Sequence, residues 1–256
     1  MNFAICIVPV MPLRAAPSHQ SEMVSQMIFG ECCEWEENID DTWIKVFCQF
    51  DGYQGWVSLN QVQTIPEHIF STPVKNLVGE WSKEAMVNGH PMHLPLGSPL
   101  KGIHSGSMSW GKMVVEYHGS LIQPGFLEIE EKLIKQYAYK YLNTPYLWGG
   151  KSPYGMDCSG FSQTVFKLLG LSIPRDANQQ AKMGEGIGFL QSARCGDLAF
   201  FDNDQGEIIH VGILLNNLEI IHASGKVRVD KIDNQGIING DTKKRTHRLR
   251  MIKRYF

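Results

Sequence analysis

The stretch WGGKSPYGMDCSG, residues 148–160, leads from a glycine-rich loop into a predicted helix over residues 159–169. Apolar residues in that helix follow the spacing i, i+4, i+7 and i+8, at Phe161, Val165, Leu168 and Leu169. Asp157 occupies the N-cap position and Gly170 the position of a C-terminal capping glycine. This pattern places Cys158 at the start of a helix.

Cys158 at that position suits nucleophilic catalysis. The helix dipole and the free backbone N–H groups of the first turn stabilise a thiolate and lower its pKa. Thiolate is the nucleophile that acyl transfer needs, although an isolated cysteine more often packs as an inert apolar residue. His210 and His222 follow in two strand-like runs, 208–215 and 218–223. A cysteine nucleophile needs a base and a partner that orients this base, and the two histidines are candidates for these two roles.

The loop between these two strands decides whether the histidines meet. Side chains alternate between the faces of a strand, so a two-residue turn at Asn216-Asn217 would place His210 and His222 on opposite faces. A loop with an odd number of residues places them on one face. We therefore predict a loop of three or five residues, in which asparagine would tolerate a positive φ.

The two halves of the chain differ in their predicted secondary structure. Up to about residue 125, short apolar runs recur between turn signals, which predicts an all-β region: 3–10, 23–29, 43–50, 55–59 and 113–117. A helix is predicted over 128–142, and the basic residues between 243 and 254 are predicted to form an amphipathic last strand.

The composition and charge of the chain argue against several classes of partner and site. The formal net charge of the 256 residues is −2, which favours neither nucleic acid nor an anionic membrane as a partner. No apolar run reaches the roughly 18 residues of a membrane span, and no signal peptide is recognised. The six cysteines show no regular pairing pattern, so we expect no disulfide framework, no metal, no cofactor and a cytoplasmic location. The sequence favours no particular oligomeric state.

The first part of the chain resembles a known small barrel. The segment WIKV at 43–46 and the segment DGYQGWV at 51–57 resemble the bacterial SH3-like (SH3b) domain, over about residues 5–62. A second, more divergent copy is expected at about 70–122. The predicted domains are therefore 1–64, 65–125 and 126–256.

The second part of the chain resembles the NlpC/p60 cysteine peptidases. The resemblance covers residues 126–256 and rests on the motifs TPYLWGG (144–150), DCSG (157–160), PRD (174–176), GDL (196–198), HVGI (210–213) and IHAS (221–224). It implies an α+β, papain-like fold, in which the cysteine helix packs on an antiparallel sheet that bears the histidines. It also implies that Cys158 attacks the amide, that His210 moves the proton, that His222 orients His210 and that Tyr146 stabilises the oxyanion.

The combination with SH3b resembles the γ-D-glutamyl-L-diamino acid endopeptidases, which act on murein peptides with a free N-terminal L-Ala and release L-Ala-D-Glu. The resemblance implies that Asp157 and Ser159 bind the free amine, although Asp157 could equally be only the helix cap. Ala177 stands where a further hydroxyl is expected. Further candidates for the cleft are Trp148 and, from the first SH3b domain, Glu22 and Tyr53.

Other interpretations remain open. Arg175 could pair with a carboxylate of the chain or of the substrate. Related papain-like domains act as amidases or as acyltransferases on lipids. A non-catalytic SH3b wall-binding protein is a third possibility, although degenerate peptidase domains usually lose the cysteine or the histidine. In the cytoplasm, the expected peptidase would recycle imported wall fragments.

Overall fold

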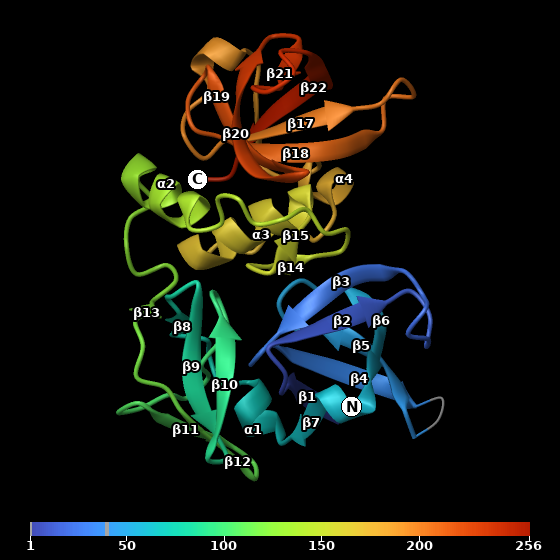
Figure 1. The fold of residues 1–256 in the computed structure, drawn as a ribbon, viewed down its shortest axis with the longest axis vertical. Coiled ribbons are helices and arrows are strands. Elements are labelled where there is room, and N and C mark those ends of the chain that lie inside the picture. Colours follow the sequence, from blue (N-terminus) through green and yellow to red (C-terminus); the bar gives the residue numbers. More distant parts are fainter. Residues whose placement is uncertain (1, 39–40) are drawn as a thin grey trace.

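A computed structural model describes residues 2–38 and 41–256, so that Met1, the start of the first predicted domain, lies outside the described residues. The chain forms three sheet-based units, which we call the N-terminal unit (2–65), the middle unit (77–122) and the C-terminal unit (131–254). The first two units lie side by side, and the C-terminal unit sits across both of them (Figure 1). The helical layer of the C-terminal unit faces the other two.

The N-terminal unit is a seven-stranded antiparallel sheet with the order β3-β2-β6-β5-β4-β1-β7. Its strands are β1 (Asn2–Cys6), β2 (Val10–Arg14), β3 (Met23–Ile28), β4 (Cys32–Asn38), β5 (Trp43–Cys48), β6 (Gln54–Ser58) and β7 (Val62–Ile65), with a 3-10 turn η1 (Leu59–Gln61) before β7. The predicted strands over 23–29, 43–50 and 55–59 match β3, β5 and β6. The single strand predicted over 3–10 is wrong, because the chain leaves β1 after Cys6 and enters β2 at Val10.

The middle unit contains a four-stranded sheet, β10-β9-β12-β11, and a two-stranded sheet, β13-β8. These strands are β8 (Leu77–Val78), β9 (Ser82–Val87), β10 (His90–Pro95), β11 (Ser107–Trp110), β12 (Met113–Glu116) and β13 (Leu121–Ile122), and the short helix α1 (Glu67–Phe70) precedes them. Phe29 of the N-terminal unit packs in the core of this unit against Trp110, with ring centroids 5.2 Å apart. The two units therefore share apolar packing. The description of the middle unit as a divergent SH3b domain stays a prediction.

The C-terminal unit packs a helix against a second seven-stranded sheet, ordered β16-β22-β17-β18-β19-β20-β21, and β21 also pairs with β22. This extra pairing closes the sheet into a barrel. The strands are β14 (Lys151–Ser152), β15 (Gly155–Met156), β16 (Glu185–Ile187), β17 (Leu198–Asp202), β18 (Ile208–Leu214), β19 (Glu219–Ser224), β20 (Lys226–Asp233), β21 (Gly236–Ile238) and β22 (Arg245–Arg254). The helices are α2 (Glu131–Tyr139), α3 (Cys158–Leu169), α4 (Ala177–Gln180) and the 3-10 turn η2 (Leu190–Ser192). The expected α+β fold, with the cysteine helix on an antiparallel sheet, is confirmed.

The helix boundaries follow local signals closely in α3 and less closely in α2. The cap residues of α3 behave as predicted: Asp157 accepts from the N–H of Gly160, and Gly170 adopts φ 88°. The helix predicted over 128–142 is shorter, because after Tyr139 the backbone tightens into i→i+3 hydrogen bonds and then turns at Asn143 with φ 68°. The last strand predicted over 243–254 is β22, which begins at Arg245 after a turn.

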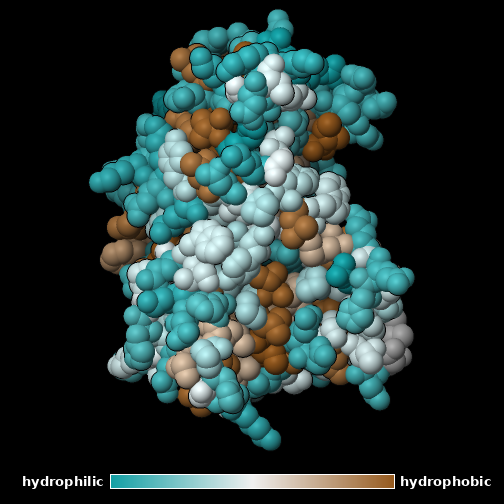
Figure 2. Space-filling view, in the orientation of Figure 1, coloured by the Kyte–Doolittle hydropathy of each residue, from teal (hydrophilic) through white to brown (hydrophobic). Residues whose placement is uncertain are grey.

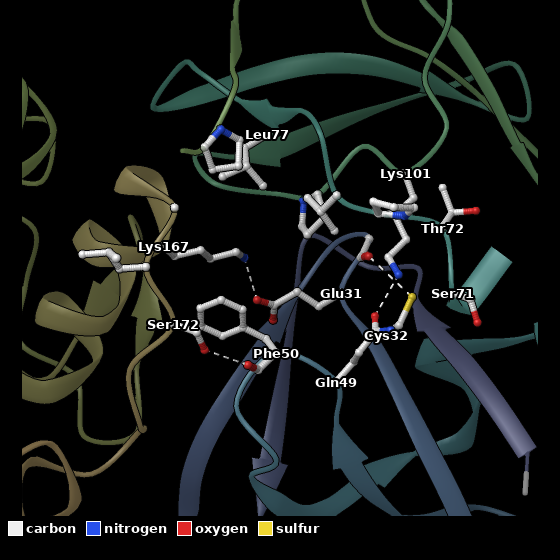
Figure 3. A pocket seen from close by; sticks show the side chains of 17 residues that line it. Glu31, Cys32, Gln49, Phe50, Ser71, Thr72, Leu77, Lys101, Lys167 and Ser172 are labelled. Atoms are coloured by element: carbon white, nitrogen blue, oxygen red, sulfur yellow. Dashed lines mark hydrogen bonds and ion pairs between the residues drawn. The ribbon is translucent and has the colours of Figure 1, made fainter. Parts of the chain in front are cut away.

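A buried ionic cluster joins α3 to the N-terminal unit (Figure 3). The carboxylate of Glu31 accepts a hydrogen bond from the Lys167 Nζ at 2.7 Å and lies 3.3 Å from the Lys151 Nζ. Beside it lies a cavity of about 420 Å³ lined by residues of all three units. Lys101 of the middle unit extends into this junction and donates to the carbonyl oxygen of Phe70 at 2.6 Å. Charged contacts therefore fix the position of the N-terminal unit against the helix that bears Cys158.

The surface in the same view is mostly hydrophilic, with apolar residues gathered where the N-terminal and middle units meet (Figure 2). Within residues 2–38 and 41–256, no helix combines the length and the hydropathy that crossing a membrane requires.

Candidate active site

Cys158 is the first residue of α3 and is 8% exposed. The preceding residue, Asp157, caps the helix: its Oδ1 accepts from the Gly160 N–H at 2.7 Å, and its Oδ2 accepts from the Gly149 N–H at 2.9 Å. The Asp157 carboxylate therefore hydrogen-bonds to both the glycine-rich loop and the first turn of α3. A side chain at Gly160 would bring its Cβ within 2.2 Å of the Gly150 carbonyl oxygen, which explains the need for glycine there.

Arg175 forms a buried ion pair with Asp157. Its guanidinium donates to both carboxylate oxygens, at 3.0 Å to Oδ1 and 2.6 Å to Oδ2, and also to the hydroxyl of Ser159 at 2.9 Å. Its Nε donates to the hydroxyl of Ser25, from β3 of the N-terminal unit, at 3.1 Å. The partner of Arg175, left open by the sequence, is thus a carboxylate of the chain itself. Arg175 and its neighbours occupy most of the acceptor positions of Asp157.

His210 and His222 lie on one face of the sheet. In β18 and β19, Ile213 pairs with Ile221 and Leu214 with Ile220, and the Leu215 N–H donates to the Glu219 carbonyl oxygen. The loop therefore has three residues, 216–218, which confirms the predicted odd length. The turn does not use a positive φ at asparagine, because neither Asn216 nor Asn217 adopts one. Instead, the Asn216 side chain accepts from the Leu218 N–H at 2.7 Å and closes the turn.

The two histidines belong to a longer chain of contacts. The Nε2 of His210 lies 2.8 Å from the Nδ1 of His222, and the Nε2 of His222 lies 3.1 Å from the Oδ2 of Asp230 on β20. The ring of His247, from β22, stacks on His210 with centroids 4.1 Å apart and an interplanar angle of 24°. Asp230 and His247 were not found from the sequence.

A local signal for Asp230 exists in the hairpin that follows His222. Ser224 pairs with Lys226 around Gly225, and His222 therefore faces Arg228 in the β19–β20 register. Asp230 lies two residues beyond Arg228 and shares its face of the sheet. Recognising the turn at Gly225 would have placed this carboxylate beside His222. His247 has no comparable signal, because β22 reaches the site from a distant part of the chain.

The thiol lies beside β18, and its pKa differs from the sequence-based expectation. Burial raises the pKa of Cys158 to about 11, the negative charge of Asp157 raises it further, and the N–H groups of Val211 and Ser159 oppose both effects. The expected lowering of the pKa by the helix start is therefore outweighed by burial. Burial also holds the pKa of His210 well below its usual range, assisted by His222 and His247. At neutral pH the pair rests as a neutral thiol and a neutral imidazole.

A cleft of about 550 Å³ opens at Cys158 between the N-terminal and C-terminal units. Its lining includes five of the residues singled out from the sequence in addition to Cys158, namely Glu22, Tyr53, Trp148, Asp157 and Ser159. The Trp148 indole N–H donates to the Glu22 carboxylate at 2.6 Å, across the two units. The structure therefore brings together all of these predicted residues.

Asp176 also lines this cleft and was not singled out as a site residue. The hydroxyl of Tyr53 donates to its Oδ1 at 3.4 Å. Burial raises the pKa of Asp176, and burial followed by the charge of Asp176 raises the pKa of Tyr53 to about 12. Unlike Asp157, Asp176 has no arginine bonded to its carboxylate among the described contacts. Ala177 follows it in the cleft wall and offers no hydroxyl.

Tyr146 lies close enough to the thiol for the two to interact electrostatically. Burial, followed by the negative charge of the Cys158 thiolate, raises the pKa of Tyr146 to about 12. The phenol is therefore protonated at neutral pH and can donate a hydrogen bond. The side chain remains 37% exposed, which leaves it accessible to a ligand.

The chemistry available here is that of thiol, imidazole, phenol and carboxylate groups. All six cysteines are free thiols, and among residues 2–38 and 41–256 no group of three or more His, Cys, Asp or Glu side chains is arranged to hold a metal ion. Such a set of groups supports acyl transfer through a cysteine.

Comparisons with known proteins agree with this arrangement. Residues 143–246 match the NlpC/P60 family, and residues 13–62 match the bacterial dipeptidyl-peptidase Sh3 domain. The chain is 34% identical over 180 residues to a γ-D-glutamyl-L-lysine dipeptidyl-peptidase of Bacillus subtilis, an alignment that covers 67% of this chain and 60% of the relative. It is 28% identical to dipeptidyl-peptidase 6 of Lysinibacillus sphaericus, over 91% of this chain and 92% of the relative.

A solved structure supports the fold over the whole chain. The crystal structure of an NlpC/P60 family protein from Bacillus cereus superimposes with a TM-score of 0.81, at 19% identity, and the match covers 99% of each chain. The family resemblance drawn from the sequence motifs is thus confirmed. Residues 143–246, which bear Cys158, form a domain of the NlpC/P60 family, and a bacterial dipeptidyl-peptidase Sh3 domain precedes it at residues 13–62.

Proposed function

We propose that this chain is a cysteine peptidase that hydrolyses the bond between γ-D-Glu and the diamino acid of murein peptides with a free N-terminal L-Ala. The single observation that carries the proposal is the cleft itself. It joins Cys158 at a helix start to two carboxylates, Glu22 and Asp176, at a wall built partly from the N-terminal unit. The names of the relatives from B. subtilis and L. sphaericus support the same reaction.

In the proposed reaction, the Cys158 sulfur attacks the carbonyl carbon of the γ-D-Glu amide while its proton passes to His210. The developing oxyanion accepts a hydrogen bond from the Tyr146 phenol. The C–N bond then breaks, and His210 returns the proton to the leaving amine of the diamino acid. Water, activated by His210, hydrolyses the thioester and releases L-Ala-D-Glu. His222 orients the His210 ring throughout.

A preference for a short N-terminal part of the peptide is a further element of the proposal, and contacts between side chains in the cleft support it. Glu22 and Trp148 meet across the two units, and Tyr53 meets Asp176 beside them. These contacts leave room for a short N-terminal part of the peptide and present negative charge to its ammonium group. We assign the ammonium to Glu22 and Asp176, because Arg175 already neutralises Asp157. Asp157 and Ser159 then shape the floor of the same subsite.

Six free thiols, five of them buried, support a reducing compartment and thus a cytoplasmic role in the recycling of wall peptides. The cytoplasmic location is therefore part of the proposed function.

The test uses purified protein and two matched peptides, L-Ala-γ-D-Glu-diaminopimelate and its N-acetylated form, with products followed by mass spectrometry. We expect L-Ala-D-Glu from the free peptide, little or none from the acetylated one, and no product with Cys158→Ala. Equal cleavage of both peptides would support catalysis by Cys158 but contradict a subsite for the free amine. Binding of wall fragments without cleavage would favour a non-catalytic wall-binding protein instead.

A further inference from the structure

Asp230 is buried behind the histidine pair, and each of its oxygens is engaged as an acceptor. Its Oδ1 accepts from the Arg228 Nη2 at 2.9 Å and from the Gly240 N–H at 2.8 Å. Its Oδ2 lies 3.1 Å from the His222 Nε2 and 2.9 Å from the Arg228 Nε. The side chain of Asp230 is 1% exposed. These donors hold the pKa of Asp230 at about 2, so that it is a carboxylate throughout the working pH range.

The state of Asp230 determines where the protons of both histidines reside. A carboxylate only accepts, so the His222 Nε2 carries a hydrogen and donates it. In neutral His222 the other nitrogen, Nδ1, is then an acceptor. Because that Nδ1 lies 2.8 Å from the His210 Nε2, the hydrogen between the two rings belongs to His210. Neutral His210 is left with an unprotonated Nδ1, the only ring nitrogen that can take a proton from Cys158.

We propose that Asp230 is a positioning residue that holds His222 and His210 in the tautomers that leave the His210 Nδ1 free to act as the base. The proposal rests on the proposed function, because it assigns a role within that reaction. It adds a fourth group to the cysteine and the two histidines. The same carboxylate favours the imidazolium that His210 becomes during the reaction, since negative charge lies at the far end of the hydrogen-bonded chain.

Asp230 is held in place by contacts that do not involve the histidines. Arg228 is itself anchored by Asp241, whose Oδ2 accepts from the Arg228 Nη1 at 2.7 Å. The Gly240 N–H comes from the turn that connects β21 to β22. These contacts allow a decisive substitution, because they constrain how an amide would sit in the same position.

In Asp230→Asn the amide oxygen keeps the Oδ1 position, where it accepts from the Arg228 Nη2 and the Gly240 N–H, and the NH₂ group takes the Oδ2 position against the His222 Nε2. The Arg228 Nε lies near that position but makes no hydrogen bond in the wild type, so the substitution removes none from it. That nitrogen must then accept, His222 carries its hydrogen on Nδ1, and His210 must accept at Nε2. The hydrogen of His210 moves to Nδ1, and the base facing the thiol is lost. A purely structural role for Asp230 would not produce this exchange of tautomers.

The experiment compares the wild type with Asp230→Asn and, as a control, Asp241→Asn. Histidine ring ¹⁵N NMR on ligand-free protein should show unprotonated Nδ1 on both His210 and His222 in the wild type, and protonated Nδ1 on both in Asp230→Asn. With the free murein tripeptide, Asp230→Asn should lose on the order of 10³-fold in kcat with little change in KM. Asp241→Asn loosens Arg228 without touching a histidine, and should keep both the tautomers and the activity.

Unchanged tautomers in Asp230→Asn, or a kcat within about threefold of the wild type, would overturn the proposal. The NMR arm needs no substrate and separates this proposal from the proposed function. Reversed tautomers in an enzyme that cleaves no murein peptide would support the role of Asp230 and sink the assigned substrate. An active wild type together with an equally active Asp230→Asn variant would support the assigned substrate and overturn the role of Asp230. Where Asp230→Asn fails to fold, Arg228→Lys, which leaves the carboxylate in place, should keep the wild-type tautomers, and their loss would count against the proposal.

Discussion

Arg175 and Asp157 form a buried ion pair directly beside Cys158, with the guanidinium Nη2 2.6 Å from the carboxylate Oδ2. The two charges act on the Cys158 thiol in opposite directions, because Asp157 raises its pKa and Arg175 lowers it. The pair therefore holds the helix start together while leaving the thiol protonated in the resting site.

Asp157→Asn should lower the pKa of Cys158, because it removes the raising charge and leaves the positive charge of Arg175 unopposed. A nearby charge shifts a pKa by roughly one unit or more. The alkylation rate of Cys158 by iodoacetamide, followed on its peptide by mass spectrometry, should show a midpoint moved by that amount to lower pH. Arg175→Met is the matched variant and should move the midpoint to higher pH. Shifts in the same direction for both variants would contradict this electrostatic account.

The same Asp157→Asn substitution should also destabilise the fold by roughly 3–5 kcal/mol, because it leaves a buried guanidinium without its counter-ion. Arg175 is 2% exposed, so its guanidinium is largely shielded from water. Urea unfolding measures the change. A loss below about 1 kcal/mol would mean that water or another group replaces the carboxylate.

Glu31 should contribute stability that depends on pH. Its carboxylate lies between Lys167 and Lys151, which lower its pKa from 4.5 to about 2 against the opposing effect of burial. A folded pKa below the unfolded one stabilises the protein above pH 4.5, and this contribution is lost as the pH falls towards about 2. The size of the contribution is about 3 kcal/mol. The free energy of unfolding, measured from pH 6 to pH 2, should fall more steeply in the wild type than in Glu31→Gln.

Glu31→Gln should itself be destabilised near neutral pH, because it leaves two buried ammonium groups without a carboxylate. Replacing all three residues, as in Glu31→Gln with Lys151→Met and Lys167→Met, should recover much of the loss. A triple variant that is less stable than the single one would show that the cluster contributes in another way.

Gly212 should be needed for the position of His222. Gly212 faces His222 across the β18–β19 pair, and a Cβ at this position would lie 2.8 Å from the His222 Cβ and 2.7 Å from the Ile220 Cδ1. Gly212→Ala therefore pushes His222 away from His210, with which it is in contact. A displacement of this kind costs on the order of 10²-fold in kcat. Gly186→Ala in β16, where no heavy atom lies within 4 Å of the new Cβ, is the control and should retain full activity.

Glu22 and Asp176 should determine the preference for a free amine. Removing either charge, by Glu22→Gln or Asp176→Asn, weakens the attraction for the substrate ammonium in a partly buried cleft. We expect a loss of roughly 10-fold in kcat/KM for the free peptide with each variant. The rate on the N-acetylated peptide should not fall, so that the ratio between the two substrates shrinks. Glu116→Gln, on the exposed face of β12, is a control that should leave the ratio unchanged. An unaltered ratio in both cleft variants would place the ammonium elsewhere, with Asp157 the next candidate.

Local patterns were sufficient to predict the helix that begins at Cys158. Asp157 and Gly170 act as caps through contacts within a few residues, so their effect is visible in a short window of sequence. The parity of the loop between β18 and β19 was predictable for the same reason, since the alternation of side chains along a strand leaves one choice that brings His210 and His222 together. The motifs around these residues were enough to identify the family.

The pKa of Cys158 was predicted in the wrong direction, because a helix start is a local feature and burial is not. The thiol loses water only when β18 packs on α3, and that desolvation exceeds the effect of the first-turn N–H groups. Arg175 was ambiguous for a similar reason. Its partner, Asp157, lies 18 residues away in sequence. The order of residues along the chain does not show which carboxylate lies nearest to Arg175 in the folded protein.

The sequence by itself determined the helix that begins at Cys158 with its caps, the strands that bear His210 and His222, and the family resemblance, because each of these depends on short-range geometry or on motifs. Only the tertiary structure decided which groups meet. It stacked His247 on His210 and brought Glu22 and Asp176 into the cleft at Cys158, whereas the local hairpin turn at Gly225 already places Asp230 beside His222. Glu31 and the lysines around it set the N-terminal unit against α3 in the same way. These contacts join segments far apart in the chain, and their energies come from burial and charge pairing, which exist only once the three units are packed together.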